Sequence, residues 1–405
     1  MQHVNCHLVK VFKGDFQTHS ASGIIRLCKA TRSRRNPLFD ARVDGLARLL
    51  VNYCVATRPG DWVLIRGDLA AQPLVERVYA HVLQAGGQPT VLYGDDRLEE
   101  AFYRTASPEQ LRWLSPADEL LAARVDARIV IRAPSNTRAL TGVDPGAQRL
   151  HQLAQKPVLD RYRKRAATGA HRWVVTNYPC PALAQEADLS LAAFEEFVYA
   201  ATYADQPDPM AAWQAVHDRQ QRLVEWLAGK SDVAVRGPHV DLRLSIAGRT
   251  FINSDGKRNM PSGEIFTGPV EDSVEGWIRF SYPALRGGRE VDGVELVFAQ
   301  GRVVEAKASK NEAYLLSQLD SDAGARYLGE FAVGTNYQIQ RFTKNILYDE
   351  KIGGTLHVAL GAGYPETGSR NESSIHWDFI CDMRTDSEIR VDGELFYKDG
   401  QFVIA

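Results

Sequence analysis

The sequence has few cysteines, no long apolar run and almost no net charge. Its five cysteines among 405 residues lie far apart without a Cys-x-x-Cys pair, which excludes a disulfide-framed secreted domain and a cysteine zinc cage. No apolar stretch approaches the roughly 18–20 residues that a membrane helix needs. The 48 basic and 50 acidic side chains nearly cancel, so no global field attracts nucleic acid or anionic lipid. We therefore expect a cytoplasmic globular protein without a nucleic-acid or membrane partner.

The first 36 residues differ in composition from the rest of the chain. They contain seven Lys and Arg side chains against one acid, Asp15, and lack an apolar segment followed by a cleavage site, so they do not indicate a secretory signal. We expect a poorly ordered basic extension over residues 1–36, or a start codon placed too far upstream. A transit peptide and an RNA-binding arm are the alternatives.

Helices and apolar strands alternate from about residue 40 onward. Apolar side chains recur at helical spacing over 43–54 and over 74–85. Short apolar runs typical of buried strands lie at 62–65, 90–93, 127–131 and 173–176. This alternation predicts an N-terminal α/β domain over 37–210, with a doubly wound, mainly parallel sheet. No Gly-x-Gly-x-x-Gly or phosphate loop follows these runs, so nucleotide binding has no support.

The character of the sequence changes after the proline-containing stretch 205–209. A helical segment follows over 213–227, and beyond it hairpin signatures predict antiparallel strands. The signatures lie at 242–251 around Ala247-Gly248, at 294–306 around Gln300-Gly301, and at 395–404 around Asp399-Gly400. Because 405 residues exceed what one core usually supports, we expect a second, strand-rich α+β domain over 211–405.

Two histidines and an aspartate of this second domain are candidate metal ligands. The two-residue period of a strand over 374–379 places His376 and Asp378 on one face and apolar side chains on the other. His357 lies mid-strand in an apolar segment, where a buried imidazole needs partners for both ring nitrogens. Each observation alone is weak, since structural hydrogen bonds can explain both.

Two glutamates lie in similarly apolar settings. Glu264 and Glu330 each stand between a glycine and an apolar residue, where burial is unfavourable without a cation. Neither segment supplies a Lys or Arg within three residues on the same strand face, whereas a metal ion would compensate the charge directly. Three carboxylates and two imidazoles exceed the need of one cation and suit a dinuclear hydrolase site, with metals about 3.5–4 Å apart. The five candidate ligands are Glu264, Glu330, His357, His376 and Asp378.

A family resemblance rests on four ordered motifs and on the strand entry Arg-Pro-Gly-Asp-Trp-Val-Leu-Ile. The motifs are Asn-Met-Pro-Ser-Gly-Glu-Ile-Phe-Thr-Gly-Pro (259–269), Leu-Gly-Glu (328–330), His-Val-Ala-Leu-Gly-x-x-Tyr (357–364) and Ile-His-Trp-Asp (375–378). Over about residues 40–405 the chain resembles the thermophilic metallo-aminopeptidases of the aminopeptidase T and S type. The basic extension departs from that pattern.

The resemblance implies a homodimeric, dinuclear metallo-aminopeptidase that acts on peptides. The five candidate ligands match the metal ligands of that family, and Tyr364 matches a tyrosine kept beside the metals. Our hypothesis is that a hydroxide bridging two divalent ions (Zn, Co or Mn) attacks the first peptide bond. Tyr364 would donate to the oxyanion, and Glu350 is a candidate general base, although an Asp-Glu-Lys turn is usually solvated.

Two alternatives have different chemistry. Ring-cleaving dioxygenases that act on dihydroxypyridines resemble the same C-terminal fold, and His357, His376 and Asp378 alone would form the facial triad of a mononuclear iron site. Such a site has no use for Glu264 and Glu330, so these two residues favour two metals. The other alternative is a binding or scaffolding relative without activity. The presence of the full set of ligand-type residues argues against it.

Overall fold

A computed structural model describes residues 40–404 of the chain. The described residues form one compact unit. The predicted basic extension over 1–36 lies outside the described residues. None of the helices within the described range has both the length and the apolar character that crossing a membrane requires.

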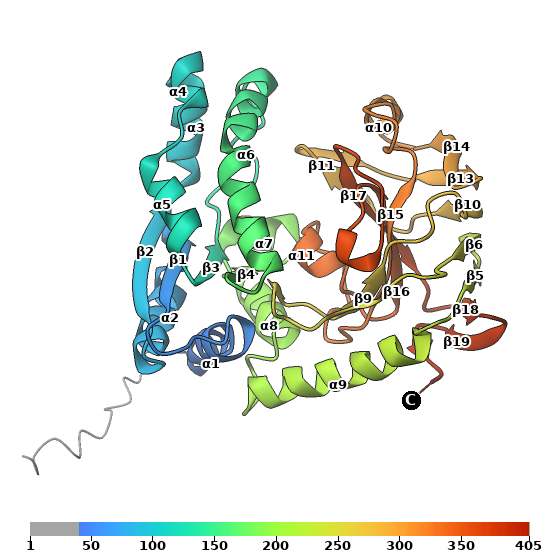
Figure 1. The fold of residues 1–405 in the computed structure, drawn as a ribbon, viewed down its shortest axis with the longest axis horizontal. Coiled ribbons are helices and arrows are strands. Elements are labelled where there is room, and N and C mark those ends of the chain that lie inside the picture. Colours follow the sequence, from blue (N-terminus) through green and yellow to red (C-terminus); the bar gives the residue numbers. More distant parts are fainter. Residues whose placement is uncertain (1–39, 405) are drawn as a thin grey trace, which may run out of the picture. The chain divides into compact units, whose positions relative to one another are not determined.

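The first part of the fold is built on a parallel sheet of five strands (Figure 1). Its strands are β1 (Trp62–Asp68), β2 (Gln88–Gly94), β3 (Ala127–Arg132), β4 (Arg172–Asn177) and β8 (Asn259–Met260). They are ordered β2-β1-β3-β4-β8, and every neighbouring pair is parallel. The four apolar runs predicted as strands are β1 to β4, so the prediction of a parallel sheet is confirmed. The fifth strand, β8, comes from a segment more than eighty residues further along the chain.

Helices pack against both faces of this sheet. They are α1 (Ala41–Leu49, continued by a π-helix over Leu50–Cys54), α2 (Gln72–Gln84), α3 (Asp96–Thr105), α4 (Pro108–Arg112), α5 (Pro116–Arg124), α6 (Pro145–Ala167), α7 (Pro181–Glu186) and α8 (Leu191–Ala201). Val63 and Ile65 belong to the buried cluster that includes α1 and α2, whereas Leu64 packs with α5 and α6. Alternate side chains of β1 therefore pack against two different layers of helices, one on each face of the sheet.

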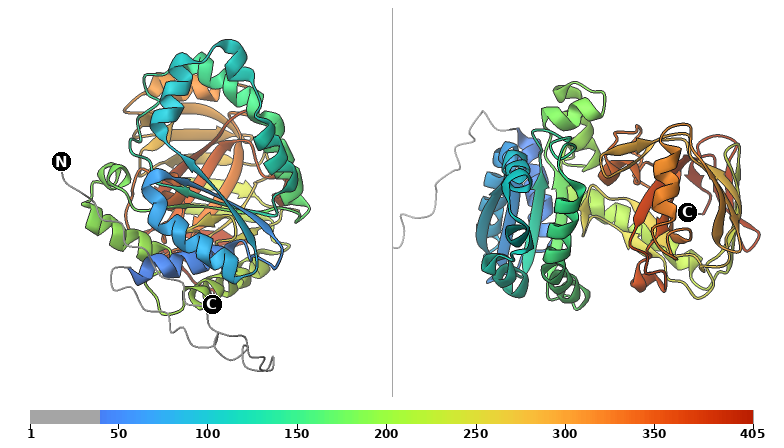
Figure 2. Two further views of the ribbon diagram at one scale, coloured as in Figure 1. Left: turned by 90° about the vertical axis from the view of Figure 1, so that its left-hand side faces the viewer. Right: turned by 90° about the horizontal axis from the view of Figure 1, so that it is seen from above.

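Antiparallel sheets form the second part of the fold, coloured yellow to red in Figure 2. The helix α9 (Pro209–Leu227) precedes them, as predicted, and α10 (Glu312–Leu319) and α11 (Ile346–Asp349) lie between strands. The strands are β5 (Asp232–Gly237), β6 (Val240–Ser245), β7 (Ile252–Ser254), β9 (Glu264–Thr267), β10 (Glu275–Arg279), β11 (Ala284–Arg286), β12 (Arg289–Val291), β13 (Glu295–Ala299), β14 (Arg302–Lys307), β15 (Leu328–Gly334), β16 (Thr355–Gly361), β17 (His376–Asp382), β18 (Glu388–Val391), β19 (Glu394–Lys398) and β20 (Gln401–Phe402).

Two of these sheets share one apolar core. The eight-stranded sheet has the order β14-β13-β10-β6-β5-β18-β19-β20, and the five-stranded sheet has the order β17-β16-β15-β9-β7. Leu242 and Leu296 of the larger sheet lie in the same buried cluster as Val358 and Phe379 of the smaller one. The apolar face of the smaller sheet is thus covered, and its other face is free to carry polar side chains.

Two of the three predicted hairpins are confirmed. β13 pairs with β14 across Gln300-Gly301, and β19 pairs with β20 across Asp399-Gly400. All four turn residues have positive φ, between 47° and 80°, as a two-residue type I′ turn requires.

The predicted hairpin at 242–251 is wrong. β6 ends at Ser245 and pairs with β5 and β10, whereas β7 pairs with β9 in the other sheet. Ala247-Gly248 does turn the chain, but Ile246 and Phe251 on either side are both buried in the shared core. The turn therefore carries the chain from one sheet to the other instead of folding it back on itself.

Burial of the parallel sheet leads to a first prediction. Ile65 is fully buried in β1, so Ile65→Ala should lower the free energy of unfolding by about 2–5 kcal/mol, because it removes apolar contacts and leaves a cavity. Leu98→Ala, at a side chain that is 71% exposed, should change it by less than about 0.5 kcal/mol. Urea denaturation measures both, and equal effects would contradict the packing described above.

Candidate metal centre

The five candidate ligands project from one face of the five-stranded sheet. Glu264 begins β9, Glu330 lies in β15, His357 in β16, and His376 and Asp378 in β17. The strands come from four separate segments of the chain, and their antiparallel pairing aligns these positions. The apolar residues between them point to the opposite face, where Ile375, Trp377 and Phe379 are buried as predicted.

Small residues on the same face leave room between the ligand-type side chains. Ala359 of β16 lies opposite Glu330 on one side and Asp378 on the other. Ala332 lies opposite His357, and Gly361 lies opposite His376. A side chain on Gly361 would place its Cβ 2.1 Å from the carbonyl oxygen of Ile375, so the close approach of β17 requires glycine there.

The ligand-type atoms converge. Nε2 of His357 lies 3.4 Å from Oε2 of Glu264 and 3.6 Å from Oε1 of Glu330. Nε2 of His376 lies 3.3 Å from Oε2 of Glu330 and 3.4 Å from Oδ1 of Asp378. Glu330 therefore directs one oxygen toward each histidine, the arrangement expected of a carboxylate shared between two cations.

These separations suit ligands of a cation better than they suit hydrogen bonds. Bonds of about 2.0–2.2 Å to a tetrahedral ion place two ligand atoms roughly 3.4 Å apart. The atoms Glu264 Oε2, His357 Nδ1, His357 Nε2 and Asp378 Oδ1 are buried and have no hydrogen-bond partner among residues 40–404. Buried polar atoms without partners are rare, so this set of oxygen and nitrogen donors fits divalent metal ions.

A hydrogen bond to the backbone fixes the orientation of the His376 ring. Its Nδ1 lies 2.7 Å from the carbonyl oxygen of Ala362. Because a carbonyl oxygen can only accept, Nδ1 carries a proton and donates a hydrogen bond to it. Nε2 is then left facing Glu330 and Asp378. Backbone partners of this kind hold metal-binding imidazoles in one tautomer.

The electrostatics of the site indicate an excess of negative charge. Burial opposes the charged form of His357, but the neighbouring Glu330 and Glu264 raise its pKa to about 9. Burial likewise opposes the charge of His376, yet Asp378 and Glu330 raise its pKa to about 12. Burial would raise the pKa of Glu330, and the two imidazoles instead lower it to about 2. The carboxylates thus attract positive charge strongly enough to overcome desolvation.

Comparison with known proteins identifies the family. The sequence model of the thermophilic metalloproteases (M29) matches residues 39–402. The chain belongs to this family. Its sequence is 28% identical to "Aminopeptidase 2" of Geobacillus stearothermophilus, over 90% of this chain and 96% of that protein. It is 29% identical to "Aminopeptidase T" of Thermus thermophilus, over 89% of this chain and 96% of that protein.

Solved structures give the same result. The structure of AmpT from Thermus thermophilus superposes with a TM-score of 0.78 at 25% identity, covering 90% of this chain and 99% of that one. A 2,5-dihydroxypyridine dioxygenase from Pseudomonas putida superposes with a TM-score of 0.52 at 12% identity, covering 91% of this chain and 99% of that one, which shows a shared fold alone. The predicted resemblance to the metallo-aminopeptidases is therefore confirmed.

In this metalloprotease the site contains a cation that the sequence reasoning missed. Lys351 follows α11, and its fully buried ammonium group lies 2.9 Å from Oε1 of Glu264 and also pairs with Glu350. The expectation that a metal ion compensates Glu264 was incomplete, because it considered only Lys and Arg residues within three positions in the sequence. Lys351 is 87 positions beyond Glu264, and only the folding of the sheet brings the two together.

The Asp349-Glu350-Lys351 segment is not the solvated turn that such a sequence usually forms. Asp349 and Lys351 are buried, and the side chain of Glu350 is 16% exposed. Burial, opposed by Lys351, raises the pKa of Glu350 to about 7. Ligand-type atoms of Glu350, His357 and Asp378 all lie within 4.8 Å of one another, so the structure places the candidate base beside the candidate ligands.

Tyr364 lies at the rim of the same site. Its ring meets the ring of His376 edge-on, with centroids 5.3 Å apart, and packs at the same distance against Phe266. The residue is 37% exposed. Burial of the phenol and the nearby carboxylates raise its pKa, so the hydroxyl keeps its proton and can act as a hydrogen-bond donor.

The position of Lys351 gives a second prediction. Lys351→Met should lower the free energy of unfolding of the chelator-treated protein by about 3–5 kcal/mol, because Glu264 and Glu350 lose their buried cation. The control is Lys344→Met, at a partly exposed ammonium group 3.6 Å from Asp188. This variant should lower the free energy of unfolding by less than about 1 kcal/mol. Equal losses in the two variants, measured by urea denaturation, would show that Lys351 does not balance the buried acids.

Proposed function

We propose that the chain is a metal-dependent aminopeptidase that releases the N-terminal residue of peptides at a dinuclear site. The observation that carries this proposal is Glu330, whose two oxygens face His357 and His376 separately. The curated relatives named aminopeptidases, at 28% and 29% identity over most of the chain, support the reaction class.

Two overlapping groups of side chains would hold the two ions. Glu264, Glu330 and His357 form the first group, and Glu330, His376 and Asp378 form the second. When bound, zinc, cobalt or manganese ions supply an activated water at neutral pH and polarise the carbonyl group of the substrate. The residues of the chain then position the peptide and transfer its protons.

Tyr364 and Glu350 are the residues we assign to these tasks. Tyr364 lies beside His376 with a protonated hydroxyl, and would donate a hydrogen bond to the oxygen of the scissile carbonyl as its charge develops. Glu350 lies beside His357 and Asp378, where its carboxylate would accept a proton from the attacking water and deliver it to the leaving amine.

We further infer that the protein acts on peptides as a homodimer in the cytoplasm. The resemblance to the family supports the dimer. The three cysteines of the described residues, Cys54, Cys180 and Cys381, are buried and unpaired, which suits a reducing compartment.

Removal of the shared carboxylate tests the dinuclear site. Glu330→Gln should reduce bound metal from two ions per chain to one or none and abolish hydrolysis of leucine p-nitroanilide, because both proposed groups lose their common ligand. Elemental analysis of the protein as purified and after loading with zinc, cobalt or manganese, together with the anilide assay, measures the two effects. The control is Glu305→Gln on β14, whose carboxylate is 53% exposed and pairs with Lys307.

The same measurements can contradict the proposal. One iron per chain that survives Glu330→Gln, together with oxygen consumption on a dihydroxypyridine and no anilide hydrolysis, would indicate a ring-cleaving dioxygenase. Normal metal content without either activity would indicate a binding protein.

Tyr364→Phe tests the proposed oxyanion contact. The variant should keep its metals and its KM and lose about 10²–10³-fold in kcat, because the lost hydrogen bond forms chiefly in the transition state. Tyr79→Phe, at an exposed tyrosine of α2, is the matched control. An unchanged kcat in Tyr364→Phe would remove this residue from the mechanism.

A further inference from the structure

A cavity of about 430 Å³ lies away from the candidate metal centre, between β1, β2 and β3 and the helices α3 to α6. Its volume is within the range of small-molecule sites. None of the five candidate ligands lines it, nor does Tyr364 or Glu350. Seven elements line the cavity, among them charged and aromatic side chains, and the proposed peptidase mechanism uses none of these residues.

One wall of the cavity carries two arginines. Arg66 of β1 and Arg128 of β3 are on the same face of the parallel sheet, because Arg128 lies opposite Leu64, two residues before Arg66. Neither forms an ion pair with an acid of residues 40–404 (the salt bridges of that range involve other arginines). Nε of Arg128 is buried and has no hydrogen-bond partner in the described part of the chain, and the guanidinium group lies 4.3 Å from the centre of the Tyr162 ring.

Neither guanidinium group has an acidic partner among residues 40–404, although Arg66 is exposed to solvent and Arg128 is only partly so. Burial and the neighbouring charge of Arg66 lower the pKa of Arg128, and Tyr162 opposes this shift. A carboxylate would compensate both guanidinium groups, and it would offer the two oxygens that a guanidinium fork binds best. The wall therefore has the chemistry of a carboxylate site.

The remaining lining contains apolar and aromatic side chains, a single acid, and the polar side chains of Gln110, Ser115 and Gln155. Trp113 is 63% exposed, and Phe102 of α3 meets the ring of His151 edge-on at 4.9 Å. Leu159 adds an aliphatic surface that is 45% exposed. Asp118 of α5 is the acid that lines the cavity, and it has no ion-pair partner among residues 40–404. Two guanidinium groups, one carboxylate and an aromatic wall complement a zwitterion that bears a large apolar side chain.

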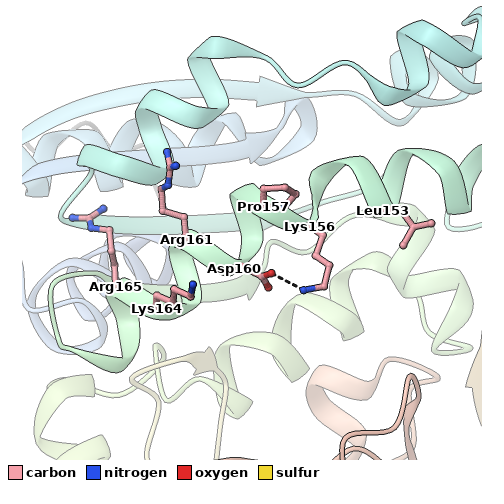
Figure 3. A pocket seen from close by; sticks show the side chains of 7 residues that line it. All are labelled: Leu153, Lys156, Pro157, Asp160, Arg161, Lys164 and Arg165. Atoms are coloured by element: carbon pink, nitrogen blue, oxygen red, sulfur yellow. Dashed lines mark hydrogen bonds and ion pairs between the residues drawn. The ribbon is translucent and has the colours of Figure 1, made fainter. Parts of the chain in front are cut away.

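A second hollow, on α6, does not share this chemistry. It has a volume of about 470 Å³ and is lined by residues of α6 alone (Figure 3). Lys156 and Asp160 pair with each other there at 2.6 Å, and no aromatic side chain contributes. Four basic side chains and one acid line this hollow, and it lacks the aromatic surface that an apolar side chain would pack on.

We propose that the cavity between the parallel sheet and α3 to α6 binds a free amino acid with a large apolar side chain. Its α-carboxylate contacts Arg66 and Arg128, its ammonium group contacts Asp118, and its side chain packs on Trp113 and Phe102. Such an amino acid is also what the proposed aminopeptidase would release. The link to the product rests on the proposed function, whereas binding itself does not.

Calorimetry of the metal-loaded protein with L-phenylalanine tests the proposal. We expect binding that Arg128→Gln weakens about 10–100-fold, because charged hydrogen bonds are lost, while Arg124→Gln, at an exposed arginine of α5, leaves it unchanged. Binding at the metal centre would persist in Arg128→Gln, so the two sites are distinguishable. Trp113→Ala, at an exposed side chain, provides a second variant that should weaken binding without affecting the fold.

Ligand analogues and hydrogen exchange complete the test. 3-Phenylpropionate lacks the ammonium group and should bind more weakly than L-phenylalanine, and phenethylamine, which lacks the carboxylate, should not bind. L-Phenylalanine should slow amide exchange over residues 108–124, which contain α4 and α5, in wild type and not in Arg128→Gln. Binding that is insensitive to Arg128→Gln, equal binding of 3-phenylpropionate, or no protection of this segment would overturn the proposal. Loss of anilide hydrolysis alone would bear on the proposed function and not on this site.

Discussion

The concentration of negative charge on one face of a small antiparallel sheet governs the chemistry of this protein. Glu264, Glu330, Glu350 and Asp378 converge there, and Lys351 is the one lysine or arginine of residues 40–404 that pairs with any of them. Isolated buried carboxylates are strongly unfavourable, so the site requires further cations. In the absence of metal, protonated imidazoles of His357 and His376 can supply part of that charge, and two divalent ions would supply it in full.

The rest of the fold makes this concentration possible. The opposite face of the sheet is buried against the eight-stranded sheet, so the polar face is held in place by an apolar core of ordinary composition. Ala332 and Ala359 lie between ligand-type residues of neighbouring strands. The carbonyl oxygen of Ala362 accepts a hydrogen bond from the imidazole of His376 and so fixes its orientation. The five candidate ligands are therefore positioned by backbone pairing, which tolerates less movement than a loop.

Part of this arrangement could be predicted from the sequence. The two-residue alternation of 375–379 gave the correct face for His376 and Asp378, because strand geometry is local. The turns at Gln300-Gly301 and Asp399-Gly400 could be predicted for the same reason. Lys351 could not, since its partner Glu264 is distant in sequence and no local signal marks a buried lysine. The hairpin at 242–251 was mispredicted because turn residues do not reveal which sheet each flanking strand joins, and α6 was missed because Pro157 lies inside it.

Diffraction with anomalous scattering from crystals of the metal-loaded protein tests the central claim most directly. The account predicts two peaks about 3.5–4 Å apart, with Glu330 bound to both, one bound also by Glu264 and His357 and the other by His376 and Asp378. A single peak held by His357, His376 and Asp378, with Glu264 bound only to Lys351, would contradict it.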